Sequence, residues 1–481
     1  MSATKLLIGD HWLDASDGAR GTTYDPATGA SIGEFAEATA DDVDRAVAAA
    51  RTGFESAEWA RMTPDARGRI LWRVADLLEE HTPDLAVLES TDQGQTQGIA
   101  AGVTLPLAAQ VFRYYAGWTT KIEGKVSPVS IPDQLTYQQR VPLGVVGIIT
   151  PWNFPLAIAA WKIAPALATG NAVVIKPAEQ TPLSTVRLVE LMREAGVPAG
   201  VVNLLTGGPE VGKALVRHRG VDAISFTGST SVGQEIARVA ADDLKRVRLE
   251  LGGKAPSIVL PDADIDAAVI GNLQGALFNT GQACGAFTRF FVHRSRVEEF
   301  TQKLAAAAES LPIGPGSAPE TVVGPLVSQE HLDRVHGLVQ SGIEQGARLV
   351  TGGARVTGDL ESGFFYPPTV FADVTDDMRI AQEEIFGPVL SVMAYDDLDE
   401  AVARANDVDY GLAAVIWTQD LKTAHTLPPR LRAGTVFVNQ LPLIDPGAPW
   451  GGFGLSGWGR EMGEYAIDEF TETQSTFINL A

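Results

Sequence analysis

The feature that most constrains this chain is a regular alternation of apolar and helical segments that begins at Val141. Four apolar runs of strand length follow, at Val145–Ile149, Ala172–Ile175, Val201–Leu205 and Ala223–Phe226. Continuous apolar strands joined by helices are typical of parallel sheets, because right-handed βαβ connections place helices over both faces. The pattern predicts a doubly wound α/β domain whose ligands lie beyond the carboxyl ends of its strands.

A second alternation of the same kind runs from about Lys254 to Asn439. Strands are expected near Phe290, Leu349, Val389, Val415 and Val436, and helices are expected at 297–311, 329–345 and 398–406. A chain of 481 residues is too long for one ordinary core, so two or three domains are expected. We therefore predict a second α/β domain.

Two segments do not fit either alternation. Residues 121–140 contain Pro128 and Pro132 among short alternating pieces, which predicts a protruding hairpin. Phe470–Phe477 alternates like an edge strand, and an exposed edge often pairs with another strand, including one of another subunit.

Charge and composition exclude several classes of partner. The net charge is 37 − 59 = −22, which argues against nucleic acids and anionic membranes. No run of 18 apolar residues and no signal-peptide core appears, so we expect no membrane partner and a cytoplasmic location. The single cysteine rules out an intramolecular disulfide and a Cys-rich zinc site, and no metal site is expected.

That single cysteine, Cys284, lies in a loop of small residues between Phe278 and Arg289. Such a loop can present a reactive thiol without steric cover. A lone cysteine is also often a buried, inert residue. The loop alone therefore leaves a nucleophile and a core residue both open.

Polar residues follow three strands of the first alternation. Asn153 lies in a loop fixed by two prolines, where an amide can donate to an oxyanion or only bond the turn backbone. Lys176 and Glu179 could hold a ribose diol or form a surface ion pair. The segment Thr227–Gly233 opens a helix with glycines and hydroxyls, which suits a pyrophosphate, although such helix starts are common.

Two carboxylates complete the set of candidates. Glu250 lies between two leucines, where burial would raise its pKa toward that of a base working at neutral pH. The alternative is a glutamate that points to solvent from an edge strand. Glu384 and Phe386 could contact a ribose and a nicotinamide, or could be a helix-end charge and a core ring.

Seven stretches, in order along the chain, match one family. They are Pro151–Pro155, Lys176–Glu179, Phe226–Ser229, Glu250–Lys254, Gly281–Cys284, Glu384–Pro388 and Ser456–Glu461. On the basis of these stretches, the chain resembles the aldehyde dehydrogenase superfamily, and the resemblance extends over essentially its full length. The resemblance implies an NAD-binding domain from residues 1–120 and 141–252, a catalytic domain from residues 253–450, and a small β oligomerisation element from residues 121–140 and 466–481.

The resemblance also implies a mechanism. The Cys284 thiolate would attack an aldehyde carbon, and the Asn153 amide and the Cys284 N–H would hold the oxyanion. Hydride transfer to NAD would leave a thioester that Glu250 hydrolyses by activating water. Lys162 and Glu461 match a pair that relays the proton onward, or they form a structural ion pair.

The cofactor implied by the resemblance is NAD. Glu179 would accept both ribose hydroxyls and repel a 2′-phosphate, which favours NAD over NADP. The residues expected at this site are Thr150, Pro151, Trp152, Lys176, Glu179, Gly212, Phe226, Gly228, Ser229, Val232, Gly233, Leu251, Glu384 and Phe386.

The aldehyde itself is less constrained by the sequence. The positions that match the substrate tunnel are Phe154, Trp161, Phe278, Phe287, Ile444 and Trp450. Aromatic walls suit an aromatic or hydrophobic aldehyde, could box a cationic amino- or betaine-type aldehyde, or could simply pack the tunnel wall. A non-redox acyl-transferring or esterase enzyme using Cys284 and a non-catalytic relative are the other classes considered. A homodimer or homotetramer is expected.

Overall fold

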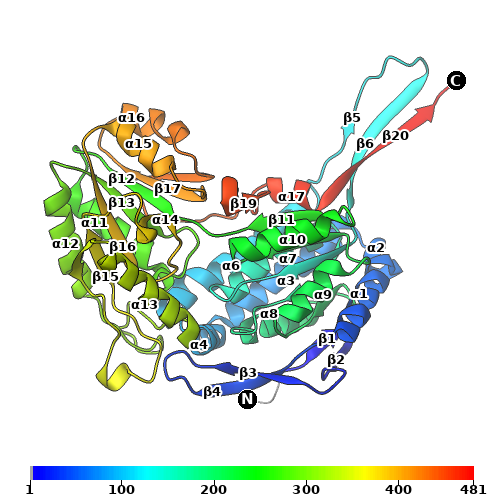
Figure 1. Ribbon diagram of the computed structural model, residues 1–481. Coiled ribbons are helices and arrows are strands. Elements are labelled where there is room, and N and C mark those ends of the chain that lie inside the picture. The colour runs from blue at the N-terminus through cyan, green and yellow to red at the C-terminus, as the bar shows by residue number, and fades with distance from the viewer. Residues whose placement is uncertain (1–3) are drawn as a thin grey trace.

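The computed structural model describes residues 4–481, which form two α/β layers side by side and a β extension that projects from them (Figure 1). Eight of the described strands form the first sheet, in the order β19–β11–β10–β7–β8–β9–β1–β2. Their bounds are β1 Leu6–Ile8, β2 His11–Leu13, β7 Val145–Ile149, β8 Ala172–Lys176, β9 Val202–Leu204, β10 Ala223–Thr227, β11 Arg246–Glu250 and β19 Gly457–Trp458. Strands β7 to β11 are parallel, as predicted, whereas β1, β2 and β19 are antiparallel to their neighbours.

Helices cover both faces of this sheet. The helices of this part of the chain are α1 Ala40–Glu55, α2 Ala57–Ala60, α3 Pro64–Glu80, α4 Thr82–Asp92, α5 Gln97–Ile99, a π-helical segment Ala100–Thr104, α6 Leu105–Trp118, α7 Pro155–Ala168, α8 Leu183–Glu194, α9 Pro209–Arg217 and α10 Thr230–Ala241. Helices α1, α9 and α10 pack with one set of strand side chains, and α3, α6, α7 and α8 pack with the other. The strand order reverses between β7 and β10, which is the place where doubly wound sheets bind ligands.

Seven described strands form the second sheet, in the order β14–β15–β16–β13–β12–β17–β18. Their bounds are β12 Ala255–Val259, β13 Phe287–His293, β14 Arg348–Thr351, β15 Thr369–Ala372, β16 Val389–Tyr395, β17 Ala413–Trp417 and β18 Thr435–Val438. The helices that follow β11 are α11 Ile265–Leu277, α12 Val297–Glu309, α13 Gln329–Glu344, α14 Arg379–Gln382, α15 Leu398–Asn406, α16 Leu421–Thr426 and α17 Tyr465–Glu469. Short 3₁₀ turns lie at Phe278–Gly281, Gly358–Leu360, Pro428–Arg430 and Gly454–Ser456.

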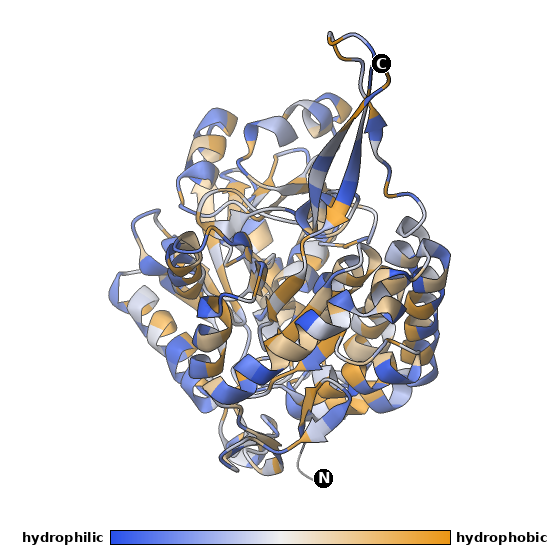
Figure 2. Cartoon of the chain, turned by 90° about the vertical axis from the view of Figure 1, so that its right-hand side faces the viewer, coloured by the Kyte–Doolittle hydropathy of each residue, from blue (hydrophilic) through white to orange (hydrophobic). Residues whose placement is uncertain are grey.

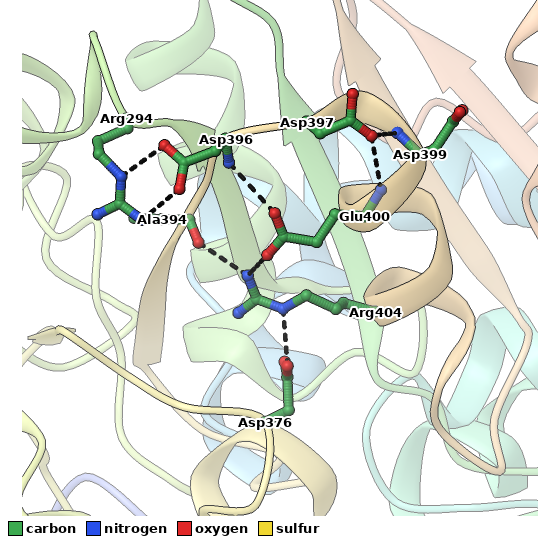
Figure 3. Close-up of polar contacts among 8 residues, drawn as sticks. All are labelled: Arg294, Asp376, Ala394, Asp396, Asp397, Asp399, Glu400 and Arg404. Carbon is green, nitrogen blue, oxygen red and sulfur yellow. Dashed lines mark hydrogen bonds and ion pairs between the residues drawn. The ribbon is translucent and has the colours of Figure 1, made fainter.

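Polar contacts fix α15 on this second layer (Figure 3). Asp397 caps the helix by accepting hydrogen bonds from the Asp399 and Glu400 backbone N–H groups, at 2.9 and 3.2 Å. Arg404, in the last turn, donates to Asp376 at 2.7 Å and to the Ala394 carbonyl at 2.8 Å. A basic residue at a helix C-terminus is favourable, so both ends of α15 are held.

The predicted hairpin and the predicted C-terminal strand meet in a separate three-stranded sheet. It consists of β5 Lys125–Val126, β6 Gln134–Pro142 and β20 Thr471–Asn479, and β20 pairs antiparallel with β6 along its whole length. The predicted C-terminal edge strand therefore pairs with β6, a strand of its own chain. Figure 2 shows this extension standing away from the body, with hydrophilic and hydrophobic residues along it.

Smaller features complete the fold. Strands β3 Arg20–Tyr24 and β4 Ser31–Ala36 form a two-stranded sheet. Helix α7 starts at Pro155, because proline is favoured in the first turn of a helix. None of the helices within residues 4–481 is long and apolar enough to cross a membrane. The doubly wound α/β fold class is confirmed, whereas the exact domain boundaries stay a prediction.

Candidate active site

A cavity of about 310 Å³ lies at the switch point of the first sheet, beyond the carboxyl ends of β7, β8 and β10. Ten of the residues expected at the cofactor site line it: Thr150, Pro151, Trp152, Lys176, Glu179, Gly212, Phe226, Gly228, Ser229 and Val232. Gly233 lies one residue further into α10, where a Cβ atom would approach a Leu251 methyl group to 2.5 Å. The first sheet thus brings these positions to one edge.

The polar groups of this cavity have geometry suited to a nucleotide. The Lys176 ammonium is buried and lies 3.4 Å from the Glu179 carboxylate. Burial lowers the pKa of Lys176, and the Glu179 charge partly opposes that effect. Ser229 caps α10, where its hydroxyl accepts from the Val232 N–H at 3.4 Å. The N-terminus of a helix of this length attracts a phosphate group.

A second cavity, of about 500 Å³, continues from the first toward Cys284. Its lining includes Asn153, Leu251, Cys284, Glu384 and Phe386, which come from distant parts of the sequence. Glu250 ends β11 in the first sheet, whereas Cys284 lies just before β13 begins in the second. The catalytic candidates therefore meet where the carboxyl edge of one sheet faces the amino edge of the other.

The loop before Cys284 is held in an unusual backbone conformation. Asn279, Thr280 and Gly281 have consecutive positive φ values of 49°, 61° and 77°. A non-glycine residue in this region costs on the order of 1 kcal/mol, so surrounding bonds must maintain it. The Asn279 amide donates to the Asn153 carbonyl at 2.8 Å, and the buried Gln282 side chain accepts from the Val327 N–H at 2.9 Å. These bonds fix the position of the thiol.

Two glycines allow the chain that follows Glu250 to approach this loop. A Cβ atom on Gly253 would lie 2.3 Å from the Cys284 carbonyl oxygen, and one on Gly252 would lie 2.3 Å from Glu384. The Glu384 carboxylate accepts a 2.8 Å hydrogen bond from the Gly253 N–H. Burial raises the pKa of Glu384 to about 7.

The electrostatics around the thiol favour the neutral form when nothing is bound. Burial raises the pKa of Cys284 well above its ordinary value, and the Glu250 and Glu384 charges raise it further. Activation therefore needs a base that accepts the thiol proton. The Asn153 amide donates one hydrogen bond to the Gln282 carbonyl at 2.9 Å, which leaves its second N–H free for an oxyanion.

Glu250 is buried, and neither carboxylate oxygen has a hydrogen-bond partner among residues 4–481. Burial and then the charge of Glu461 raise its pKa well above the ordinary value. Glu461 forms an ion pair with Lys162, and both side chains are buried. Glu250 therefore points into the interior, and the alternative of a solvent-facing glutamate is wrong.

Several of the residues expected in the substrate tunnel lie close to one another or to the Cys284 loop. The rings of Phe154 and Phe278 stack with their centroids 5.6 Å apart, and the Trp450 ring lies beside Gly285, where a Cβ atom would approach it to 2.9 Å. Trp161 is buried on α7, and Ile444 is partly buried against the same core.

Phe287 lies elsewhere than predicted. It has no exposed surface and packs edge-on against Phe437, with ring centroids 6.0 Å apart. This is the packing of a core residue, because the strand residues of β13 are covered on both faces. We therefore remove Phe287 from the proposed substrate wall.

Comparison with known proteins identifies the chemistry that this arrangement serves. Residues 12–476 match the sequence profile of the aldehyde dehydrogenase family. This chain belongs to the aldehyde dehydrogenase family. The match covers the second sheet, all strands of the first sheet from β7 onward, and every catalytic candidate named above.

Several relatives are similar over almost the full chain. DhaS of Bacillus subtilis (strain 168) is 49% identical over 477 residues, covering 99% of this chain and 96% of that protein. Retinal dehydrogenase 2 of Homo sapiens is 45% identical, with coverage of 99% and 92%. Mitochondrial benzaldehyde dehydrogenase of Antirrhinum majus is 44% identical, with coverage of 99% and 89%. The NAD⁺ complex of an aldehyde dehydrogenase from Bacillus cereus superposes with a TM-score of 0.98 at 46% identity, covering 100% and 97% of the two chains.

The protein is thus an NAD-dependent aldehyde dehydrogenase, and the first cavity fits that cofactor. Lys176 and Glu179 provide a donor and an acceptor for a ribose diol, and the start of α10 suits the pyrophosphate. Apolar side chains from α9 and α10 also line this cavity, among them Val216, Ile236 and Val239, and such surfaces suit a flat apolar ring. The cavity chemistry therefore agrees with the comparison.

The structure also shows site residues of this aldehyde dehydrogenase that sequence reasoning missed. His331 and Arg334, from α13, line the second cavity. Arg334 donates to the Glu384 and Ile385 carbonyls at 2.6 and 2.7 Å, and the His331 ring lies 2.7 Å from the Phe386 carbonyl. They hold the segment that carries Glu384 through its backbone, a role that no local sequence pattern marks.

Proposed function

We propose that this aldehyde dehydrogenase oxidises an aromatic or hydrophobic aldehyde to its carboxylic acid, with Cys284 as nucleophile and Glu250 as base. The stacked pair Phe154–Phe278, with Trp450 beside the Cys284 loop, is the observation that carries the substrate class. Flat apolar rings favour an aldehyde whose carbon skeleton is itself apolar.

The first step makes a carbon–sulfur bond. Glu250 takes the thiol proton of Cys284, and the resulting thiolate attacks the aldehyde carbon. The carbonyl oxygen then carries a negative charge, which the free N–H of the Asn153 amide and the Cys284 backbone N–H would stabilise. A neutral donor suits this task, because the charge exists only after attack.

The second step breaks the carbon–hydrogen bond of the former aldehyde. NAD⁺, when bound, accepts the hydride and becomes NADH. The oxyanion collapses at the same time, which leaves a thioester on Cys284. Trp152 and Phe386, whose rings meet edge to face at 5.2 Å, form a wall of the cavity next to the thiol.

The third step hydrolyses the thioester. Glu250 must first pass on the proton that it took from Cys284, and the buried Glu461–Lys162 pair is suited to receive it, since it lies close enough to shift the pKa of Glu250. Glu250 then takes a proton from water, and the hydroxide adds to the thioester carbon. The Cys284 thiolate leaves with the electrons of the carbon–sulfur bond and takes the proton back from Glu250. The products are the carboxylic acid and a restored thiol.

Two relatives support the same substrate class, because they are named as dehydrogenases of retinal and of benzaldehyde. The test compares kcat/KM for benzaldehyde with that for betaine aldehyde, using NAD⁺. We expect benzaldehyde to be preferred by at least tenfold. Preference for betaine aldehyde would show that the aromatic walls bind a cation, and ester hydrolysis without NADH formation would favour the non-redox class.

We further propose that the β5–β6–β20 sheet joins subunits of a homodimer or homotetramer in the cytoplasm. Val126 and Phe477 on this sheet, and Ile131 and Leu480 in the segments next to its strands, are each more than half exposed, which is unfavourable in an isolated subunit. Light scattering of the wild type and of Phe477→Ser measures the oligomeric state directly. A monomeric wild type would contradict the proposal.

A further inference from the structure

A row of polar side chains crosses the face of the first sheet that α7 covers, beneath the active site. Arg248 and Glu250 lie two residues apart on β11, so both side chains point to the same face. Ser225 of β10 is the register neighbour of Arg248, and its hydroxyl accepts a 3.2 Å hydrogen bond from Lys162. The row connects the proposed base to a buried arginine.

The surroundings of Arg248 are unusual for a charged side chain. Only 3% of its side chain is exposed, and its guanidinium lies 4.2 Å above the Phe470 ring. Glu469 is 3.8 Å from Nε, beyond hydrogen-bond distance. Nε and Nη1 have no hydrogen-bond partner among the described residues. A buried guanidinium with free donors is costly, so its presence calls for a role.

A cavity of about 70 Å³ adjoins Arg248. Ser225, Glu469 and Phe470 line the cavity together with Arg248. The volume is sufficient for several water molecules, and the free donors and the Ser225 hydroxyl give them partners. Within residues 4–481 no group is hydrogen-bonded to Nε or Nη1, so the arginine acts on the row through its charge.

Charge balance in the row depends on Arg248. Glu250 and Glu461 contribute two negative charges, and Lys162 contributes one positive charge that is engaged in the ion pair with Glu461. Arg248 supplies the second positive charge, so the four groups together are neutral. Without it the buried group would carry one net negative charge, and protonation of Glu250 would relieve that charge.

The pKa directions agree with this balance. Burial and Glu461 raise the pKa of Glu250, whereas Lys162, Arg248 and Arg460 lower it. The charged and titratable groups around Glu250 and Arg248 come from six parts of the fold: Tyr115 (α6), Lys162 (α7), Arg248 (β11), Cys284 (the loop before β13), Arg460 and Glu461 (the segment after β19), and Glu469 (α17).

We propose that Arg248 is a positioning residue of the reaction, whose buried guanidinium keeps the Glu250 carboxylate ionised and available as a base. This inference rests on the proposed role of Glu250. Glu469, next to the arginine, weakens the effect because its negative charge partly offsets the guanidinium. Substitutions that remove the charge of Arg248 or of Glu469 should therefore shift the pH dependence of kcat in opposite directions.

The first test is the pH dependence of kcat with benzaldehyde and NAD⁺. In Arg248→Met the acid limb should move up by about 0.5–1 pH unit, with activity recovered at high pH. Arg248→Lys keeps the charge and should return the limb toward the wild-type position. A loss of activity that is uniform across pH, with the limb unmoved, would show that Arg248 only supports the fold.

The second test does not depend on how well Arg248→Met folds. Glu469→Gln keeps the shape of the side chain and its ability to accept from the Arg460 N–H, a 3.2 Å hydrogen bond. The acid limb should move to lower pH, and an unmoved or raised limb would overturn the inference. Glu250→Gln separates the failure of this inference from the failure of the proposed function. Normal turnover in Glu250→Gln would refute the role of Glu250 as base. Lost turnover in Glu250→Gln, together with unmoved acid limbs in the Arg248 and Glu469 variants, would refute only the role of Arg248.

Discussion

The carbonyl oxygen of Cys284 approaches Gly253 so closely that a Cβ atom on that glycine would lie 2.3 Å away. This contact joins the loop that carries the nucleophile to the segment that follows the base. A glycine is needed at this position, because the obstacle is a backbone atom that cannot rotate away.

Gly253→Ala should therefore displace the Cys284 loop. We expect kcat/KM to fall by about 100-fold or more, because a shift of about 1 Å in a reacting group has that effect. Gly337→Ala is the matched control, since no atom lies within 4 Å of its Cβ position and φ is not positive. Steady-state kinetics decide the point, and equal activity of the two variants would contradict the packing argument.

Asn153→Ala removes the proposed side-chain donor to the oxyanion. Its amide already gives one hydrogen bond to the Gln282 carbonyl, so the loss also releases part of the Cys284 loop. We expect kcat to fall by about 10²–10³-fold, the usual effect of deleting one such donor. Retention of more than a third of the wild-type kcat would mean that the oxyanion is held elsewhere.

Glu179→Ser tests the selection of NAD over NADP. Glu179 lies next to Lys176 at the edge of the first cavity, where it can accept from a ribose diol and repel a 2′-phosphate. We expect kcat/KM with NAD⁺ to fall about tenfold, the effect of losing a hydrogen bond to a charged acceptor. The value with NADP⁺ should rise. A wild type that prefers NADP⁺ would refute this assignment.

Glu89 gives a prediction about stability and pH. It is buried, and burial raises its pKa from 4.5 to about 7. The folded state therefore binds a proton that the unfolded state releases between these values, so rising pH destabilises the protein across this window. Above pH 7, Glu89→Gln should be more stable than the wild type by up to about 3 kcal/mol, and below pH 4.5 the difference should vanish.

Thermal unfolding at pH 5 and pH 8 measures this difference. Glu58→Gln, at an exposed position on α2, should leave Tm unchanged at both pH values. If Glu89→Gln lowers Tm at pH 8, the carboxylate is ionised in the folded state and stabilised by a partner.

Much of the fold could be predicted from local patterns. The apolar runs at β7, β8 and β10 set the parallel sheet, and the residues that follow them, including Thr150, Lys176 and Ser229, do line one cavity. These predictions succeed because strand ends in a parallel sheet share one edge. The fully buried Phe287 could not be separated from the wall residues, because a ring on a strand looks the same whether it faces a tunnel or the core.

Other features depend on contacts between distant segments. Strand β19 joins the first sheet from the C-terminal part of the chain, and Arg334 fixes the Glu384 segment through carbonyl groups. Strand β19 has only two residues, and the other contact is made by a single long side chain. Neither is long enough to produce a periodic pattern in the sequence. The burial of Arg248 is of the same kind, because an arginine next to an apolar strand residue ordinarily points to solvent.

The central claim is that Cys284 carries the acyl group and that Glu250 is needed to release it. The most direct measurement is the intact mass and peptide map of Glu250→Gln after mixing with NAD⁺ and benzaldehyde. We predict one equivalent of NADH, formed more slowly than in the wild type because the thiol proton must then go directly to water, and one benzoyl group attached to Cys284, which Cys284→Ala lacks. NADH formed without any adduct, or an adduct on another residue, would contradict this account.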